Sequence, residues 1–451
     1  MKLIYQIKDR PKFGQLIVFA IQQLLAIMAA TLVVPIIIGN GMQPNAALFG
    51  AGMGTLVYLL FTKFKSPVFL GSSFAFLGSM AAAFAGASSV ALGYLGLILG
   101  AAFAGLVYVV IAIIVKFAGT AWINKLMPAV VIGPTVAIIG LSLAGNAVGD
   151  LTGSEATLKA ATSPYVSLIC GLVTLAVVTI CSTYGKKTIK LIPFVIGILA
   201  GYVVASIFTV IGILSGNTEL IVIDFSFFTN LLNNGAVTLN TFFTLPKFTF
   251  LTALGGFEAI DGAYIGSIAM AYVPVAFVVF AEHIADHKNI SSIIETDLLE
   301  EPGLHRTLLG DGVGSMVGAL FGGCPNTTYG ESVACVAITG NASVYTILAA
   351  AIGAIAISFL SPFVAFVDSI PPCIMGGVCM ALYGFIAVSG LKMLQKVNLE
   401  ENRNLFTASV ILIAGIGGLS VSFGQITITS IACALILGIL VNLLLSKKSA
   451  E

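Results

Sequence analysis

"CPNTTYGES" occupies residues 324–332, and "PVFLGSSFAF" occupies residues 67–76. Both lie within apolar segments, and both bring a proline together with glycine and hydroxyl residues. This combination interrupts a helix and leaves backbone N–H and C=O groups without helical partners. Within a bilayer, such groups are tolerated only where they line a cavity or are buried in protein. The two stretches therefore predict two broken membrane spans beside a polar cavity; two ordinary kinked helices are the alternative.

The composition of the chain is that of an integral membrane protein. Hydrophobic residues make up 58% of the 451 residues, charged residues make up 9%, and the mean hydropathy is +1.08. Soluble globular proteins carry about 25% charged residues. The net charge of +1 creates no global field that would attract nucleic acid. The seven cysteines form no CxxC pair, so neither a zinc site nor a disulfide framework is indicated, and no cofactor is expected.

A bilayer-crossing helix needs roughly 20 mostly apolar residues, and fourteen segments of this chain are candidates. They are approximately residues 14–39, 45–62, 67–86, 91–115, 127–147, 164–183, 191–214, 264–286, 306–323, 325–339, 343–367, 372–391, 404–419 and 426–446. The third and tenth are short and contain the two stretches quoted above. The predicted fold class is an all-α polytopic membrane protein.

The lysines and arginines support this count. If the N-terminus is cytoplasmic and the spans alternate, every one of the 20 Lys and Arg residues except Lys159 and Lys247 lies on the cytoplasmic side. The positive-inside rule predicts such a bias for a correct topology. Both termini are therefore predicted to be cytoplasmic, in a multi-pass protein of the cell membrane.

Two halves of seven spans each must have opposite orientations in the membrane, because seven is an odd number. Inverted repeats of this kind are common in secondary transporters, whose binding sites lie at broken helices near the midplane. The two broken spans take the third place in each half. Their matching positions predict a transporter with its site between them.

Two carboxylates fall inside predicted spans. Glu282 lies about four residues before the predicted end of the eighth span, and Glu331 follows Gly330 in the broken tenth span. A carboxylate in a bilayer costs several kcal/mol unless it is paired, protonated or exposed to a polar cavity. Both are therefore predicted to face the cavity and to be able to take up a proton.

The stretch "AEHIADHK" at 281–288 surrounds Glu282 with further ionisable groups. Asp286 lies one turn after Glu282 on the same helix face, whereas His283 points about 100° away, with His287 one turn beyond it. Two interpretations of Asp286 stay open: a group that modulates proton binding at Glu282, or a helix-end residue in water. His283 is interpreted as a packing residue, and His287 with Lys288 as the start of the cytoplasmic boundary.

A metal site is the alternative for this cluster. His283 and His287 are spaced i, i+4, as in the HExxH pattern of zinc enzymes. The glutamate precedes the first histidine instead of following it, however, and no third ligand cluster is evident. Asp311, one or two turns into the ninth span, is interpreted as structural. The sequence favours a binding pocket, and no enzyme activity is expected.

Six motifs resemble those of one transporter family over roughly residues 12–446. They are "QQLLAIMAATLVVP" (22–35), "GSSFAF" (71–76), "AEHIADH" (281–287), "EPGLHR" (301–306), "PNTTYGES" (325–332) and "MGGVCMALYG" (375–384). Their order and spacing identify the chain as similar to the nucleobase:cation symporters, the nucleobase-ascorbate transporter family. That family includes the bacterial uracil:proton symporters and the xanthine and urate permeases.

The resemblance implies a particular architecture. Spans 1–4 (residues 1–115) and 8–11 (251–367) would form a core domain, and spans 5–7 (116–250) and 12–14 (368–451) a gate domain. Each broken span would carry a short β-strand, and the two strands would pair at the midplane. A homodimer through the gate domains is also implied.

The resemblance also implies roles for individual residues. Glu282 falls on the family's eighth-span glutamate and Glu331 on the acidic position of the uracil branch. Phe74 and Gly330 fall where backbone N–H groups meet ligand carbonyls. The positions that pack around the base are matched by three further residues: Ala30, Tyr329 and Tyr383.

By this resemblance the chain is expected to import uracil with a proton, using Glu331, Glu282 and Asp286 for coupling. One departure favours the purine branch, because uracil symporters typically have histidine where this chain has Asp286. Glu331 and Ser332 favour the uracil branch, because the purine branch usually has glutamine and asparagine there. A xanthine or urate symporter using protons or sodium, and an anion transporter of the same fold, are the alternatives.

Overall fold

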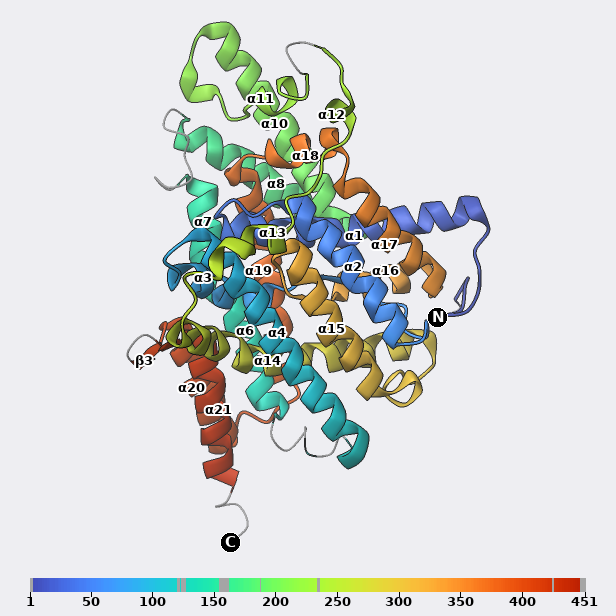
Figure 1. The fold of residues 1–451 in the computed structure, drawn as a ribbon, viewed down its shortest axis with the longest axis vertical. Helices are drawn as coiled ribbons and strands as arrows, with labels where there is room; N and C mark the ends of the chain where they lie inside the picture. Colours follow the sequence, from blue (N-terminus) through green and yellow to red (C-terminus); the bar gives the residue numbers. More distant parts are fainter. Residues whose placement is uncertain are drawn as a thin grey trace.

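The computed structural model describes residues 3–119, 122, 127–153, 162–186, 188–232, 236–423 and 426–446. Its architecture is a bundle of helices with two small two-stranded sheets (Figure 1). Several of the lysines on which the predicted membrane orientation is based lie outside the described residues. They are Lys2, Lys125, Lys159, Lys187, Lys447 and Lys448.

The elements of the first half alternate long helices with short connections. They are α1 (Phe13–Ile38), α2 (Pro44–Phe61), β1 (Leu70–Ser72), η1 (Phe74–Phe76), α3 (Leu77–Ala85), α4 (Val90–Ala118), α6 (Ala129–Ser142), α7 (Ala144–Thr152), α8 (Pro164–Tyr184), α9 (Thr188–Leu191), α10 (Pro193–Ser215), η2 (Thr218–Leu220), α11 (Ser226–Thr229), α12 (Leu239–Phe242), α13 (Thr249–Ala253) and η3 (Leu254–Gly256).

The second half begins with the longest helix described. Its elements are α14 (Gly262–Ile294), η4 (Leu299–Gly303), α15 (Leu304–Gly322), β2 (Asn326–Thr328), α16 (Gly330–Thr339), α17 (Val344–Ser358), α18 (Ser361–Asp368), α19 (Pro372–Leu394), α20 (Asn402–Ile416), β3 (Val421–Phe423), β4 (Ile426–Ile428) and α21 (Ser430–Ser446). Asp261 caps α14, because its carboxylate accepts a hydrogen bond from the Tyr264 N–H at 2.7 Å.

The chain is predominantly helical, as predicted, and each predicted span contains at least one helix. Among the described residues, eight helices are long and apolar enough to cross a membrane, and further apolar helices are shorter. The count of fourteen crossings stays a prediction.

Three predicted spans have different ends in the structure. The eighth does not stop at 286, because α14 continues to Ile294. The eleventh is divided into α17 and α18, since Pro362 at the start of α18 cannot continue a preceding helix. The fourteenth begins as strand β4, which pairs with β3 before α21 starts.

The two broken spans meet in a short, buried sheet, which we call the central sheet. Strands β1 and β2 are antiparallel, with Leu70 opposite Thr328 and Ser72 opposite Asn326, and all their residues are buried. Beyond them the chain turns helical again, into η1 and α3 in one span and into α16 in the other. The predicted pairing of two short strands is confirmed.

Hydrogen bonds around this sheet satisfy the buried backbone. The Leu70 N–H donates to the Thr55 hydroxyl at 3.0 Å, and the Ser73 N–H donates to the Pro325 carbonyl at 2.8 Å. The Phe69 N–H donates to the Ser332 hydroxyl at 3.0 Å. An unpaired backbone group inside a membrane costs several kcal/mol, so the Ser and Thr residues explain how two helices can break here.

The helices fall into two packed groups. In one, α2 contacts α15 and α17, and α4 contacts α14 and α15; in the other, α19 contacts α6, α7 and α8, and α20 contacts α6 and α21. The first group contains both strands of the central sheet, since β1 also contacts α2 and β2 contacts α15.

Glycines allow α2 and α15 to approach closely. A Cβ added at Gly54 would lie 2.7 Å from the Gly314 carbonyl oxygen, and one added at Gly50 would overlap with the Gly318 carbonyl oxygen. Close helix contacts in membranes depend on such small residues, because van der Waals packing drives the association.

We expect Gly50→Ala to destabilise the protein by about 1–3 kcal/mol, because the new methyl group must displace backbone. The thermal midpoint of the purified protein in detergent measures this effect. Gly353→Ala in α17 is the matched control, since the nearest atom to its added Cβ is Leu24 Cδ2 at 3.8 Å. Equal midpoints for the two variants would contradict the close approach.

Candidate functional site

A pocket of about 160 Å³ lies between the two groups of helices, beside the central sheet. Its wall comes from η1, β2 and the start of α16, together with faces of α14, α6 and α19. The lining residues are Phe74, Ala75, Ile132, Val136, Ile139, Glu282, Ala285, Asp286, Thr327, Thr328, Tyr329, Gly330, Glu331, Leu382, Phe385, Ile386, Ser389 and Met393.

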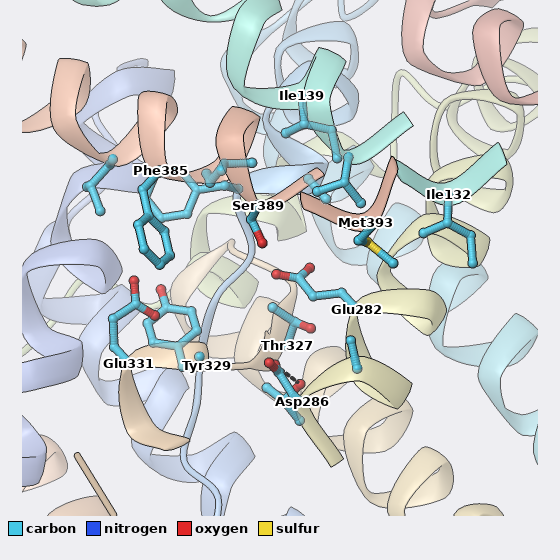
Figure 2. Close-up of a pocket in the computed structure, with 18 residues that line it drawn as sticks. Ile132, Ile139, Glu282, Asp286, Thr327, Tyr329, Glu331, Phe385, Ser389 and Met393 are labelled. Carbon is cyan, nitrogen blue, oxygen red and sulfur yellow. Dashed lines mark hydrogen bonds between the residues drawn. The ribbon is translucent and has the colours of Figure 1, made fainter. Parts of the chain in front are cut away.

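Three carboxylates face this pocket. Glu282 and Asp286 project from α14 one turn apart, and Glu331 projects from the first turn of α16 on another side (Figure 2). The Thr328 hydroxyl donates a hydrogen bond to Asp286 Oδ2 at 2.8 Å. Among the described residues, no Lys, Arg or His lines the pocket. Its charge can therefore be balanced only by protons, a cation or hydrogen-bond donors.

Helix starts supply such donors. Gly330 and Glu331 are the first residues of α16, and Phe74 opens η1, which leads into α3. The first N–H groups of a helix have no partner within it, and the helix dipole places partial positive charge at this end. The pocket thus combines carboxylate acceptors with backbone N–H donors, which suits a neutral ligand that carries both donors and acceptors.

The residues predicted to pack around a ligand lie at different depths. Tyr329 lines the pocket, and its hydroxyl donates to the Ser72 carbonyl at 2.7 Å. Ala30 and Tyr383 are buried, with 2% of each residue exposed, and neither lines the pocket. Tyr383 lies behind Phe74, with ring centroids 6.3 Å apart in an edge-on arrangement. Direct ligand contact by Ala30 and Tyr383 stays a prediction.

His283 points away from the pocket, about 100° around α14 from Glu282. It is fully buried, with Nδ1 at 2.7 Å from Asp311 Oδ2 and Nε2 at 3.0 Å from the Thr307 hydroxyl. These bonds fix α14 against α15 at the residue that follows Glu282. The predicted packing role of His283 and the structural role of Asp311 are confirmed.

His287 is also buried, whereas Lys288 beside it is exposed; the cytoplasmic boundary at these two residues stays a prediction. Its Nδ1–H donates to the His283 carbonyl at 2.8 Å, and its Nε2 lies 2.7 Å from the Tyr58 hydroxyl. That hydroxyl also bonds Ser66 at 2.7 Å. The His283 carbonyl belongs to the same helix, and Tyr58 comes from a distant part of the chain; together they satisfy the polar ring within α14.

The continuation of α14 also decides between the two interpretations of Asp286. It lies in the middle of a helix and lines the pocket, so the helix-end interpretation was wrong. Within the described residues, no group of three or more His, Cys, Asp or Glu side chains is arranged to hold a metal ion.

The sequence of the chain matches the model of a permease family (Xan_ur_permease) over residues 14–424. The uracil permease of Bacillus caldolyticus is 39% identical over 449 residues, covering 98% of this chain and 95% of that protein. The uracil permease of Escherichia coli K12 is 33% identical and covers 97% of this chain and 93% of its own length. The chain belongs to this permease family.

Solved structures show the same fold at low sequence identity. The transmembrane domain of the cyanobacterial bicarbonate transporter BicA matches with a TM-score of 0.64 at 15% identity, covering 97% of this permease and 99% of that chain. The murine Slc26a9 anion transporter in its inward-facing state matches with a TM-score of 0.63 at 11% identity. The match covers 98% of this permease and 70% of that chain. With its many apolar helices, this permease is a multi-pass membrane protein, and permeases are transporters rather than enzymes.

Sequence reasoning missed several pocket residues of this permease. Thr327, Thr328 and Ser389 bring hydroxyl groups to the pocket, and the Thr327 hydroxyl has no hydrogen-bond partner among the described residues. Ser389 lies one turn after Phe385, on the same face of α19. Helical periodicity along α19 could have indicated this face, but not that it borders Glu282.

Proposed function

We propose that this permease imports uracil together with protons by alternating access. The names of its relatives support the substrate, and the pocket supports the chemistry. Uracil is neutral and carries N–H donors beside carbonyl acceptors. The carboxylates of Glu282 and Glu331 would accept from its N–H groups, and the backbone N–H groups of Phe74 and Gly330 would donate to its carbonyls.

The observation that carries this proposal is the meeting of two opposite kinds of group in one pocket. Glu282 and Glu331 face a space that is also bordered by helix starts from both broken spans. A site that satisfies every polar atom of its ligand rejects analogues that lack one of them. Such a pocket would distinguish uracil from bases with a different order of donors and acceptors.

Proton coupling follows from the charge of the pocket. Three carboxylates without a cationic neighbour among the described residues repel one another and are costly to enclose in a low-dielectric site. Uptake of a proton by Glu331 or Glu282 would remove one of these charges. Binding of the base and binding of the proton would then favour the same closed state, which couples their transport.

Alternating access would use the two groups of helices as core and gate domains, in fourteen spans with inverted repeats. The antiparallel pairing of β1 with β2 supports the inversion. Glu282, Glu331 and the sheet belong to the proposed core (1–115 and 251–367), whereas Ile132 and Ser389 belong to the proposed gate (116–250 and 368–451). Movement of one against the other would open the pocket alternately to each side.

The proposed orientation places both termini in the cytoplasm, supported by the distribution of Lys and Arg along the sequence. We further propose a homodimer through the gate domains. Chemical crosslinking of the protein in native membranes tests the dimer, and accessibility of single cysteines placed at each terminus tests the orientation.

One observation favours a second candidate, a purine symporter. Asp286 lines the pocket, where uracil symporters typically have histidine. The proteins of this fold named above transport anions. An anion substrate is nevertheless disfavoured here, because the three carboxylates of the pocket would repel it.

Thermal stabilisation by candidate ligands tests the proposed function. A ligand that binds only the folded state raises its stability in proportion to the logarithm of ligand concentration over Kd. We expect uracil to raise the thermal midpoint of the purified protein, and xanthine, sulfate and zinc to leave it unchanged. Stabilisation by xanthine but not by uracil would favour the purine alternative and contradict the proposal.

We expect Asp286→Asn to shift the pH dependence of uracil uptake towards lower pH by about one unit. Removal of a negative charge one turn from Glu282 makes the remaining carboxylates release protons more readily, and one pH unit corresponds to 1.36 kcal/mol. Initial rates in proteoliposomes over a range of internal and external pH measure the shift. An unaltered profile would show that Asp286 takes no part in coupling.

A further inference from the structure

A second cavity adjoins the pocket described above. It has a volume of about 670 Å³ and lies between α14 and the facing helices α6 and α19. Ile132, Ala285 and Met393 line both spaces. We call this second space the vestibule. Its shared wall means that a molecule in the vestibule lies next to the proposed uracil site.

The vestibule has the opposite charge to the pocket. Lys288 of α14 and Lys396, just after the end of α19, both line it, together with the amide of Asn289. No Asp or Glu among the described residues lines it. The remaining wall is apolar, so the vestibule presents two ammonium groups beside an apolar surface.

Part of the vestibule wall lies inside the protein. Met127, Phe280 and Ala281 line it and are buried, with 3%, 1% and 5% of each residue exposed. Both lysines, by contrast, are exposed. A ligand would therefore enter past the lysines from water, which is the cytoplasm in the proposed orientation.

We propose that the vestibule binds a nucleoside monophosphate, with the phosphate between Lys288 and Lys396 and the nucleoside against the apolar wall. Ammonium groups bind phosphate oxygens through charge-assisted hydrogen bonds. A free phosphate ion would leave the apolar wall unfilled, whereas a nucleoside part fills it. The bound nucleotide separates α14 from α6 and α19, and thereby holds the pocket open to the cytoplasm and inhibits transport from that side. This inhibitory consequence rests on the proposed uracil transport.

Binding of uridine monophosphate to the full-length protein in nanodiscs of neutral lipid tests the site. Uridine and inorganic phosphate are the comparison ligands, and uracil binding is measured in the same samples. We expect the double variant Lys288→Gln with Lys396→Gln to bind the nucleotide about tenfold more weakly or worse and to bind uracil as before. Lys392→Gln is the matched control, because this exposed lysine of α19 lines neither space.

Four results would overturn the proposal. They are no nucleotide binding to the unmodified protein, equal nucleotide binding by the double variant, equal binding of inorganic phosphate and nucleotide, and stabilisation by anionic lipid in place of the nucleotide. Nucleotide binding without uracil binding would leave the vestibule site standing and would instead contradict the proposed uracil function.

Discussion

Replacement of Glu331 by glutamine should weaken uracil binding at least about a hundredfold and abolish proton-driven uptake. In the proposed site the carboxylate would accept hydrogen bonds through both oxygens, whereas the glutamine amide would place a donor against an N–H group of the base. Hydrogen bonds to charged groups contribute about 1.5–3 kcal/mol, and an unpaired polar group left in the closed site adds to the loss. Glu331 also lies in the first turn of α16, where the helix dipole favours a negative charge.

Equilibrium binding of radiolabelled uracil to purified protein measures this loss, and the thermal midpoint without ligand shows whether the variant is folded. Glu300→Gln is the control, since it makes the same chemical change at an exposed position outside the pocket. A wild-type affinity of the Glu331→Gln variant for uracil would contradict the proposal that this pocket binds uracil.

Replacement of Glu282 by glutamine should reduce uracil accumulation driven by a pH gradient to the level of empty vesicles. Glutamine is neutral at every pH of interest, so the variant cannot take up a proton at this position while the base is bound. His283 does not line the pocket, and its bond to Asp311 of α15 keeps α14 in place. The expected loss is therefore one of coupling and binding rather than of folding.

Proteoliposomes with an imposed pH gradient measure this accumulation, and exchange of labelled for unlabelled uracil without a gradient measures binding and movement alone. Loss of accumulation with residual exchange identifies Glu282 as a coupling group, and loss of both identifies it as essential for binding. Gradient-driven accumulation at the wild-type level would contradict both roles.

The two broken spans and the pocket carboxylates were predictable because their signals are local. Proline, glycine and hydroxyl residues break a membrane helix wherever they occur together, and a carboxylate in an apolar segment requires a polar neighbour. Glu282 and Glu331 therefore stood out in the sequence. The pairing of β1 with β2, by contrast, was predicted from the family resemblance, because it joins segments far apart in the sequence.

The features that the sequence did not indicate depend on distant partners. The polar residues after Asp286 suggested the end of a helix, but Tyr58 satisfies His287, and α14 continues for two further turns. Ser389 reaches the pocket because α19 packs against α6, a contact without a local signal. The break before Pro362 was the exception, since a proline there is a local signal that was overlooked.

The pairing of β1 with β2 has a consequence for how the protein is made. Ser72 and its hydrogen-bond partner Tyr329 are 257 residues apart in the sequence. A ribosome that adds 5–20 residues per second needs about 10–50 s to synthesise that distance. Throughout this interval β1 has entered the membrane without its partner strand. The first half of the chain therefore stays in the bilayer with the backbone groups of β1 unpaired until the second half is inserted beside it.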